Sequence, residues 1–600
     1  MPDMIARLRT SAEWQFLSIF RRASPGLAAA WWLLVAVRGL LPAAFAIAMG
    51  SLVGAVAGHG PLTGPLVAVG ALFVLMNALG PVGGTVGSIL GAKSGAWLHD
   101  RLMTATTAPA GLAHLERSDL GDELARAREF DNGIVAPPLG AALPYVATGF
   151  AEITAAVAQA ALLCTYRWWA GIVLGLVWAS SHVLLRESAM WKVFYADHVT
   201  KQQRHVQYAY RLAVDALGAK EIRLFGLSDW AVERVRGLRA KLTDLLFHER
   251  RLRQRPLGWS LALIAAGNAL VFGFLARDAS QHVLPLSRVV VFAQAAIGVS
   301  MMAFGDFDWW FRGSAQPIPT LLGLADRMKD AGIVATGTRS AAGHPESAIR
   351  FEDVRFTYPT TGVNVLDGFE LEIPAGSSLA IVGPNGAGKT TLAKLLCRLY
   401  DPQGGAVLVD GIDLREFDVA SWRSRLAAVF QDFVRFELSL RDNVAPAGAP
   451  SDAVLRALDR AGAHDLADPA TVLSRAYEGG TDLSGGQWQR IALARAMCAV
   501  EMGAGVVVLD EPTAQLDVRG EAEIFDRILQ TTRGLTTILI SHRFSTVRHV
   551  DRICVLEHGR VVELGSHDEL IAAGGRYRTM FDLQASRFYT DPDEEVEALV

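Results

Sequence analysis

The sequence has few cysteines and few charged residues for its length. Four cysteines occur in 600 residues, none of them in a CxxC pair, so we expect buried thiols and neither a disulfide framework nor a zinc site. Charged residues make up 20% of the chain and apolar residues 51%, which excludes a disordered protein. The net charge of -4 shows no basic excess, so no nucleic-acid partner is expected.

Charge is scarcest in the amino-terminal half. Arg38 is the only charged residue between positions 26 and 92, and Glu152 and Arg167 are the only two between 132 and 185. A helix that crosses a bilayer needs about 20 mainly apolar residues, and a buried helix of a soluble core would carry a polar face that these stretches lack. We therefore predict six membrane-spanning helices, at residues 26–57, 64–92, 138–164, 168–185, 257–277 and 287–311.

Lysine and arginine in the connections predict the orientation of the spans. Basic residues gather in the first 25 positions, in 93–128 and in 186–255, where 23 of 70 residues are charged, so these regions are expected in the cytoplasm. The short connections carry little positive charge and are expected outside; they lie near His59, Arg167 and Asp278. This pattern predicts a multi-pass protein of the cell membrane with both termini in the cytoplasm.

The two long cytoplasmic connections are expected to be helices that leave the bilayer and turn back, near residues 112–121 and 203–213. Residues 325–348 are rich in Gly, Ala, Ser and Thr and are typical of a linker. From residue 349 the pattern changes to short apolar runs, turns and amphipathic helices, which predicts an α/β domain that ends near residue 585.

A glycine-rich loop in this domain fits the phosphate-binding pattern GxxxxGK[ST]. The apolar run SLAIVG leads into Gly383-Pro384-Asn385-Gly386-Ala387-Gly388-Lys389-Thr390, and the helical run TLAKLLCRLY follows. Backbone N–H groups of such a loop wrap a phosphate, the lysine reaches the terminal phosphates, and the threonine hydroxyl holds Mg²⁺. The sequence therefore predicts a nucleotide site here.

Two further features support this site. The run VVVLDE places Asp510 and Glu511 at the carboxyl end of a predicted buried strand, where open α/β sheets bind ligands. Asp510 is expected to bind Mg²⁺ through water, and Glu511 to take a proton from an attacking water. Ser484-Gly485-Gly486 precedes a helical run and forms a second anion site, which favours a nucleotide shared between two chains.

With these motifs in this order, residues 10–585 resemble the ATP-binding-cassette (ABC) exporters that fuse six membrane helices to one cassette. The resemblance implies an all-α six-helix transmembrane domain of the type I exporter fold, followed by an α/β P-loop ABC ATPase domain. The implied divisions are a cytoplasmic elbow (1–25), the transmembrane domain (26–324), a linker (325–348), the nucleotide-binding domain (349–585) and an acidic tail (586–600).

The resemblance also implies roles for single residues, with ATP and Mg²⁺ as ligands. Tyr358 is the aromatic that stacks on adenine, and Asp517 lies in the loop between the two ATP sites. The implied nucleotide-binding residues are Tyr358, Gly383, Pro384, Asn385, Gly386, Ala387, Gly388, Lys389, Thr390, Thr391, Ser484, Gly485, Gly486 and Gln487. The implied catalytic residues are Glu511, His542 and Gln431, and the implied Mg²⁺ ligands are Thr390, Gln431 and Asp510.

The activity implied is ATP hydrolysis that drives export by alternating access. A homodimer is the expected assembly, and a heterodimer with a related half-transporter is the alternative. Two departures from the family pattern occur: residues 477–480 read Tyr-Glu-Gly-Gly where many relatives have Gly-Glu-Arg-Gly, and Gln515 stands where a small residue is common. Neither departure removes a catalytic group.

The substrate is open at this point. The runs KEIRLFGL (220–227) and SGGQWQ (484–489) resemble exporters of modified, lantibiotic-type peptides; a multidrug or lipid exporter is the alternative, and a fused importer a more distant one. No leader-cleaving cysteine protease is expected, because the first 25 residues contain no cysteine. Ionisable residues at membrane depth are candidates for substrate contact, with an interior ion pair or a place at the membrane surface as the alternative. These candidates are Arg38, Glu152, Asp306 and Asp308.

Overall fold

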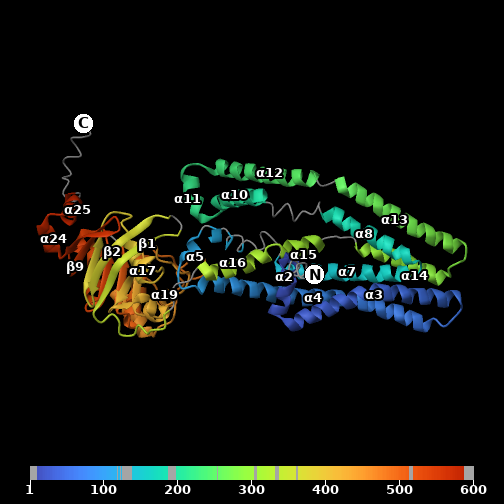
Figure 1. The fold of residues 1–600 in the computed structure, drawn as a ribbon, viewed down its shortest axis with the longest axis horizontal. Coiled ribbons are helices and arrows are strands. Elements are labelled where there is room, and N and C mark those ends of the chain that lie inside the picture. The colour runs from blue at the N-terminus through green and yellow to red at the C-terminus, as the bar shows by residue number, and fades with distance from the viewer. Residues whose placement is uncertain are drawn as a thin grey trace. The chain divides into compact units, whose positions relative to one another are not determined.

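The fold is known from a computed structural model, in which the chain divides into two compact units. Unit 1 comprises Met1–Ala105 and Asp122–Arg327, and unit 2 comprises Thr106–Gly121 and Met328–Val600 (Figure 1). The structure describes residues 10–117, 119–121, 123–124, 127, 138–186, 197–252, 255–302, 307–331, 337–359, 362–512 and 518–586.

Helices make up the ordered elements of unit 1 over its described residues. They are α2 (Ala12–Ala23), α3 (Pro25–Ala57), α4 (Thr63–Thr107), α7 (Leu139–Cys164), α8 (Trp168–Arg186), α10 (Asp197–Val214), α11 (Ala216–Leu224), α12 (Ser228–Leu252), α13 (Arg255–Ser280), α14 (Leu286–Val299), the 3-10 turn η1 (Ser300–Met302), α15 (Phe307–Ala315) and α16 (Ile318–Ala331).

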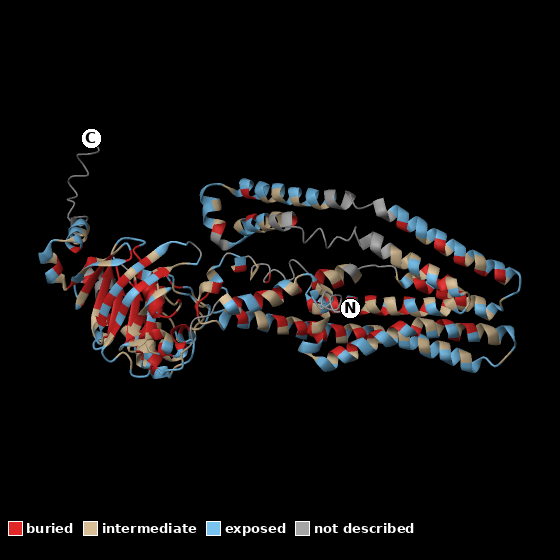
Figure 2. Cartoon of the chain, viewed as in Figure 1, coloured by how far each residue is buried: buried red, intermediate tan, exposed pale blue. Residues whose placement is uncertain are grey.

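Four of these helices are long and apolar enough to cross a membrane: Pro25–Ala57, Thr63–Thr107, Leu139–Cys164 and Gly258–Ser280. Trp168–Ser180 and Leu286–Met302 are apolar but shorter. Large apolar side chains are exposed along these helices, including Val67 at 69% and Trp259 at 78%, and pale-blue positions recur along them in Figure 2. A continuous apolar surface of this kind suits contact with lipid rather than water.

The sixth predicted helix is interrupted, so the prediction of one helix over 287–311 is wrong. Helix α14 ends at Val299, and a 3-10 turn follows before α15 begins at Phe307. The N–H and the hydroxyl of Ser300 both donate to the carbonyl of Ile297, three residues earlier, the hydroxyl at 2.6 Å. Bonds to that carbonyl tighten the helix into the 3-10 form.

The second predicted cytoplasmic turn is also misplaced, because residues 203–213 lie inside α10. This stretch contains no Gly or Pro, and nothing in it ends a helix. The chain leaves the helix at Asp215, whose backbone is extended, and reverses after α11 at Gly226, which has a φ of 64°. The run KEIRLFGL therefore forms most of α11 and the turn after it.

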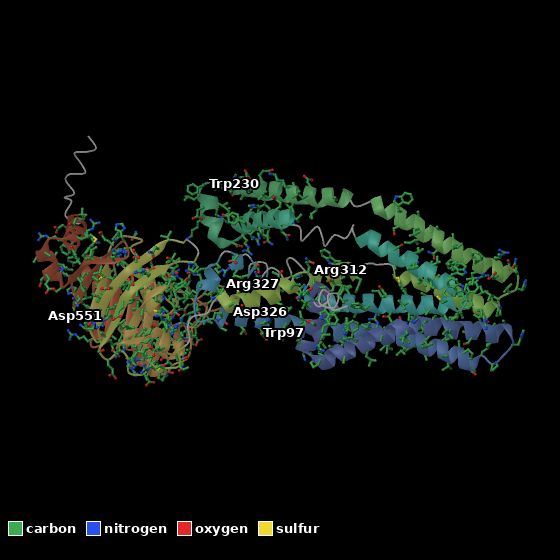
Figure 3. The ribbon with its side chains drawn as sticks, in the orientation of Figure 1. Trp97, Trp230, Arg312, Asp326, Arg327 and Asp551 are labelled. Carbon is green, nitrogen blue, oxygen red and sulfur yellow. The ribbon has the colours of Figure 1, made fainter. Side chains whose placement is uncertain are left out.

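Polar contacts join helix ends within unit 1. The hydroxyl of Tyr166 and Nη2 of Arg167, between α7 and α8, both donate to Oδ2 of Asp278, near the end of α13, at 2.6 and 2.7 Å. Arg312 of α15, labelled in Figure 3, donates through Nη1 to Oε1 of Glu13 in α2 at 2.9 Å. The connections α7–α8 and α13–α14 thus lie together at one end of the helices.

Unit 2 contains two sheets. The antiparallel sheet has the order β2-β1-β4-β5, and the second sheet has the order β10-β9-β3-β8-β7-β6 and is parallel except for β10. The strands are β1 (Ala348–Thr357), β2 (Asn364–Pro374), β3 (Ser378–Val382), β4 (Gly404–Val409), β5 (Ile412–Asp413), β6 (Leu426–Val429), β7 (Val506–Asp510), β8 (Thr536–Ile540), β9 (Arg552–Glu557) and β10 (Arg560–Gly565).

The helices of unit 2 cover these sheets. They are α5 (Ala113–Glu116), α17 (Lys389–Leu396), η2 (Leu414–Glu416), α18 (Val419–Arg423), α19 (Leu440–Val444), α20 (Ser451–Arg460), α21 (Gly485–Glu501), α22 (Val518–Thr531), α23 (Phe544–Val547), α24 (His567–Ala573) and α25 (Arg576–Ser586). Alternate residues of β3 enter two cores, one shared with β1, β2 and α17 and the other with α21. The strands are accordingly mostly red in Figure 2.

Strand β3 is anchored at its start by Asp551, labelled in Figure 3, whose Oδ2 accepts from the Ser378 N–H at 2.7 Å. The cysteines are all free, and Cys397, Cys498 and Cys554 are buried as expected, whereas Cys164 is half-buried. Burial raises the pKa of Cys397 and of Cys554 to about 12, so both remain neutral thiols.

The predicted linker differs from the structure at its start, because residues 325–331 continue helix α16. Their sequence, ADRMKDA, consists mainly of good helix formers. Asp410, which follows β4, holds the end of the predicted linker. Its carboxylate accepts the backbone N–H groups of Glu346, Ser347 and Ala348 at 2.7–3.0 Å and lies 2.6 Å from Nδ1 of His344. Burial raises the pKa of Asp410, but these hydrogen bonds more than offset it and hold the pKa below the usual range.

Candidate nucleotide-binding site

The predicted phosphate loop connects β3 to α17. Gly383, Gly386 and Gly388 have φ values of 147°, 81° and 105°, which L side chains rarely adopt. A Cβ on Gly383 would also lie 2.1 Å from the carbonyl oxygen of Leu556, so the loop can pass this strand only with glycine there. The glycine spacing of the motif therefore sets the path of the backbone.

Lys389 lies within this loop. Its Nζ donates to the carbonyl oxygens of Gly383 at 2.8 Å and Pro384 at 2.9 Å, and the residue is 8% exposed. Burial lowers the pKa of Lys389, while the charges of Glu511 and Asp510 act in the opposite direction. The ammonium is thus held where a phosphate wrapped by the loop would meet it.

Two acidic residues lie at the carboxyl end of β7, as predicted. The Thr390 hydroxyl donates to Oδ2 of Asp510 at 2.8 Å, and Oε1 of Glu511 lies 2.9 Å from Nδ1 of His542. Burial raises the pKa of Asp510 despite the hydrogen bond from Thr390, and the neighbouring Glu511 raises it further. Strands β7 and β8 pair in parallel, so the residues that follow them meet at one edge of the sheet.

These side chains line one cavity of about 460 Å³. The residues around it are Tyr358, Val365, Asn385, Gly386, Gly388, Lys389, Thr390, Thr391, Gln431, Asp510, Glu511 and His542. All but Val365 were singled out from the sequence. Val365, on β2, was missed because an apolar strand residue carries no chemical signal. Gly383, Pro384 and Ala387 belong to the loop but not to the lining.

The predicted second anion site is separate from this cavity within the described residues. Ser484 caps helix α21: its hydroxyl accepts from the Gln487 N–H at 3.4 Å, and its N–H donates to Oε1 of Gln487 at 2.8 Å. Neither residue lines the cavity, nor do Gly485 and Gly486. Asp517 lies outside the described residues.

One contact that the sequence did not predict joins α21 to the acidic edge of β7. Nε2 of Gln489 donates to the carbonyl oxygen of Glu511 at 3.2 Å, and Glu511 has a φ of 51°. This contact holds the backbone that carries the Glu511 carboxylate. Gln489 follows the predicted signature within SGGQWQ, which is the only sequence signal that could have pointed to it.

The residues present fit a Mg²⁺ ion bound together with phosphate. Thr390, Asp510 and Gln431, whose side chains carry a hydroxyl, a carboxylate and an amide, line the same cavity, and the first two already lie at hydrogen-bond distance. Oxygen ligands with a single carboxylate are typical of Mg²⁺ sites that are completed by nucleotide phosphates and water.

Comparison with known families agrees with this geometry. Residues 366–514 match the family model described as ABC transporter, a stretch that includes the phosphate loop, Gln431, Ser484, Asp510 and Glu511. Unit 2 carries an ABC ATPase domain. The predicted architecture, a helical amino-terminal region with apolar helices followed by an ABC ATPase domain, is confirmed at this level.

Relatives of this chain include named transporters. An ATP-dependent lipid A-core flippase of Thiobacillus denitrificans is 40% identical over 257 residues, 42% of this chain and 44% of the relative. A multidrug efflux ATP-binding/permease protein of Mycobacterium bovis is 42% identical over 262 residues, 42% of this chain and 21% of the relative. A β-(1→2)glucan export ATP-binding/permease protein of Rhizobium etli is 41% identical over 252 residues, 41% of this chain and 42% of the relative.

These similarities cover only part of each protein. The matched stretch of this chain spans less than half the length of each of the three relatives. An ABC ATPase domain implies ATP binding, and the cavity around Lys389 is the candidate site for it. The three relatives are named for the activities of those proteins, which are lipid A-core flipping, multidrug efflux and glucan export.

Proposed function

We propose that this protein is an ATP-driven exporter of the cell membrane. One observation carries the proposal: Lys389, Thr390, Asp510, Glu511 and His542 converge on one cavity of an ABC ATPase domain, in a chain that also contains long apolar helices. The relatives named as a flippase, an efflux protein and an exporter support the same direction of transport.

We propose that six helices span the membrane, with both termini in the cytoplasm. Besides the four long apolar helices, α8 and α14 with η1 supply the two shorter ones. The contacts of Tyr166 and Arg167 with Asp278 support this topology, because they join the two connections that the charge pattern assigns to the outside. The domain divisions implied by the resemblance, 26–324 for the membrane and 349–585 for the ATPase, are part of the proposal.

The proposed active unit is a dimer, most simply of two copies of this chain. ATP would lie between Lys389 of one copy and the partner subunit's Ser484 and Gly486, which accounts for an anion site away from the cavity. Charge-assisted hydrogen bonds to the γ-phosphate, each worth about 1.5–3 kcal/mol, would hold the two domains closed. A heterodimer with a related half-transporter is the alternative assembly.

Hydrolysis would undo this closure. Glu511 accepts a proton from the attacking water, the new bond forms at the γ-phosphorus, and the bond to the ADP oxygen breaks. His542, held 2.9 Å from Glu511, would contact the γ-phosphate. Thr390, Gln431 and Asp510 would hold Mg²⁺, which when bound would neutralise phosphate charge. Loss of the phosphate separates the domains, and the membrane helices return to the inward-facing state.

Two sequence runs, the names of the relatives and one membrane cavity bear on the substrate. The runs at 220–227 and 484–489 favour a modified peptide, whereas the names of the relatives point to lipids, drugs or glucan. A cavity of about 160 Å³ among the membrane helices is lined by Arg38 and Glu152. We propose that Glu152 contacts a cationic group of the substrate there. Asp306 lies outside the described residues, as does the side chain of Asp308.

Glu511→Gln tests the proposed function. The amide cannot accept the proton, so ATPase activity should fall about 10²- to 10⁴-fold while ATP binding persists, which traps a closed, ATP-bound dimer. ATP occlusion and dimer closure, measured on the full chain in liposomes, provide the readout. The matched control is Glu352→Gln, an exposed carboxylate paired with Arg350 outside the cavity, which should keep the parental rate. A Glu511→Gln protein that hydrolysed ATP at the parental rate would overturn the proposal.

A further inference from the structure

The stretch Thr106–Gly121, which follows helix α4 in the sequence, packs within unit 2 against the carboxyl end of α17. The N–H of Leu112 donates to the carbonyl oxygen of Leu399 at 3.0 Å, and Nη2 of Arg423 donates to the carbonyl oxygen of Ala110 at 2.6 Å. Helix α17 begins at Lys389 in the phosphate loop. One eight-residue helix therefore connects this stretch to the ATP site.

Lys394, on α17, contacts both this stretch and the aromatic side of the cavity. Its Nζ lies 3.8 Å from Oε1 of Glu116, the last residue of α5, and the two side chains are 25% and 32% exposed. The same ammonium lies 5.3 Å from the ring centroid of Tyr358 and 6.0 Å from that of Tyr400. Both distances are within the range of cation–π attraction.

Tyr358 is held from several sides. Phe356 and Tyr400 meet its ring edge to face, at centroid distances of 5.0 and 5.6 Å, and its hydroxyl lies 3.1 Å from Oγ1 of Thr391 in the phosphate loop. Tyr400 is 5% exposed; burial raises the pKa of its phenol and the Glu116 carboxylate raises it further, so Tyr400 stays neutral. Lys394 thus lies between Glu116 and the Tyr358 ring and contacts both.

We propose that Glu116 and Lys394 are positioning residues for the base of ATP: Lys394 holds the Tyr358 ring against which the base stacks, and Glu116 holds Lys394. This inference rests on the proposed role of Tyr358.

The test measures the dissociation constant of ATP for the full chain in detergent with EDTA, so that no hydrolysis occurs. Lys394→Met and Glu116→Gln should each raise it about twofold to fivefold, the loss expected of one partly exposed cation–π contact. Lys394→Arg keeps the positive charge and should bind as the parent does. Asp119→Asn is the matched control, because Asp119 lies in the same stretch and pairs with its neighbour Arg117.

Two readouts separate positioning from general damage to the domain. Competition by inorganic tripolyphosphate, which has no base, should be unchanged in Lys394→Met and Glu116→Gln. In a Tyr358→Leu background, the same two substitutions should have no further effect on ATP affinity. Unchanged ATP affinity in both single variants would overturn the inference, as would equal losses for tripolyphosphate or losses that persist without Tyr358. This experiment measures only ATP binding, whereas the proposed function concerns export. A protein that bound ATP but exported nothing would therefore refute the proposed function without affecting the result of this experiment.

Discussion

Asp410 is a single carboxylate that fastens the segment before β1 to the antiparallel sheet. It accepts three consecutive backbone N–H groups and contacts His344, and its side chain is 12% exposed. Hydrogen bonds to a charged acceptor contribute about 1.5–3 kcal/mol each, more than neutral ones. The sequence analysis did not single out Asp410, because its partners lie more than sixty residues away.

Asp410→Asn should lower the free energy of unfolding of the full chain by about 2 kcal/mol at pH 7. The pKa of Asp410 is lower in the folded protein than the unfolded value of about 3.9, so this stabilisation is present above about pH 4 and is lost as the pH falls towards the folded pKa. Thermal unfolding at pH 7 and at pH 3 should therefore show a smaller difference from the parent at the lower pH. Asp367→Asn, in an exposed pair with Arg560, is the control and should cost less than about 1 kcal/mol.

Glu152→Ala tests the proposed substrate contact at the membrane cavity. A carboxylate at membrane depth is costly unless it has a function or a partner, and the cavity that it lines also contains Arg38. If Glu152 binds a cationic group of the substrate, the variant should lose transport by tenfold or more and retain ATPase activity. Unchanged transport would show that Glu152 does not contact the substrate, and would favour the alternative that Glu152 belongs to an interior ion pair.

Among the residues that line the cavity, Tyr358, Gln431 and His542 were named only through the family resemblance. Those of the phosphate loop, and the pair Asp510 and Glu511 after an apolar run, were marked by their spacing and could be predicted from the residues themselves. Val365 and Gln489 could not. Val365 is an ordinary strand residue, and Gln489 acts on Glu511 through a contact between residues 22 positions apart. Contacts of this kind depend on how α21 packs beside β7, which spacing does not encode.

At the scale of elements, helices α21 and α24 begin with the same capping box. Ser484 pairs with Gln487, and Ser566 pairs with Glu569, each through a side chain and a backbone N–H in both directions. A capping box stabilises a helix by satisfying N–H groups of its first turn. The two serines can therefore be substituted as a matched pair, because only Ser484 has a proposed ligand, the ATP bound to the partner copy.

Ser484→Ala and Ser566→Ala should each lower the free energy of unfolding by about 1 kcal/mol. ATPase activity should fall about tenfold in Ser484→Ala, because a hydrogen bond to the γ-phosphate across the dimer is lost, and should be unchanged in Ser566→Ala. Thermal unfolding and steady-state ATPase rates of both variants check this. Equal ATPase rates in the two variants would mean that Ser484 caps its helix and does not contact ATP.

The starts of the long apolar helices were easier to predict than the breaks and turns that follow them. The starts of α3, α4, α7, α8 and α13 lie within two residues of the predicted ones, because long uncharged runs leave no alternative. The break after α14 was missed, since Ser300 within an apolar run gives no signal until its hydroxyl is seen to turn back. The turn after α10 was predicted too early, because the chain leaves that helix only at Asp215 and reverses only at Gly226.

At the scale of the whole molecule, charge distribution predicted an apolar helical half and an α/β ATPase half. It did not predict that Thr106–Gly121 belongs with unit 2 although it follows α4 directly. That membership rests on contacts such as Leu112 with Leu399, between residues nearly three hundred positions apart. Charge distribution does not encode long-range packing of this kind.

The most direct test of the central claim, ATP hydrolysis coupled to transport, is the ATPase rate of the full chain in liposomes with candidate peptides, drugs and lipids. The account predicts that the parental protein hydrolyses ATP and that at least one of these classes raises its rate. Lys389→Ala should show neither basal nor raised activity, because the ammonium that meets the phosphates is gone. Hydrolysis by Lys389→Ala at the parental rate, or a parental rate that no class of compound changes, would contradict the account.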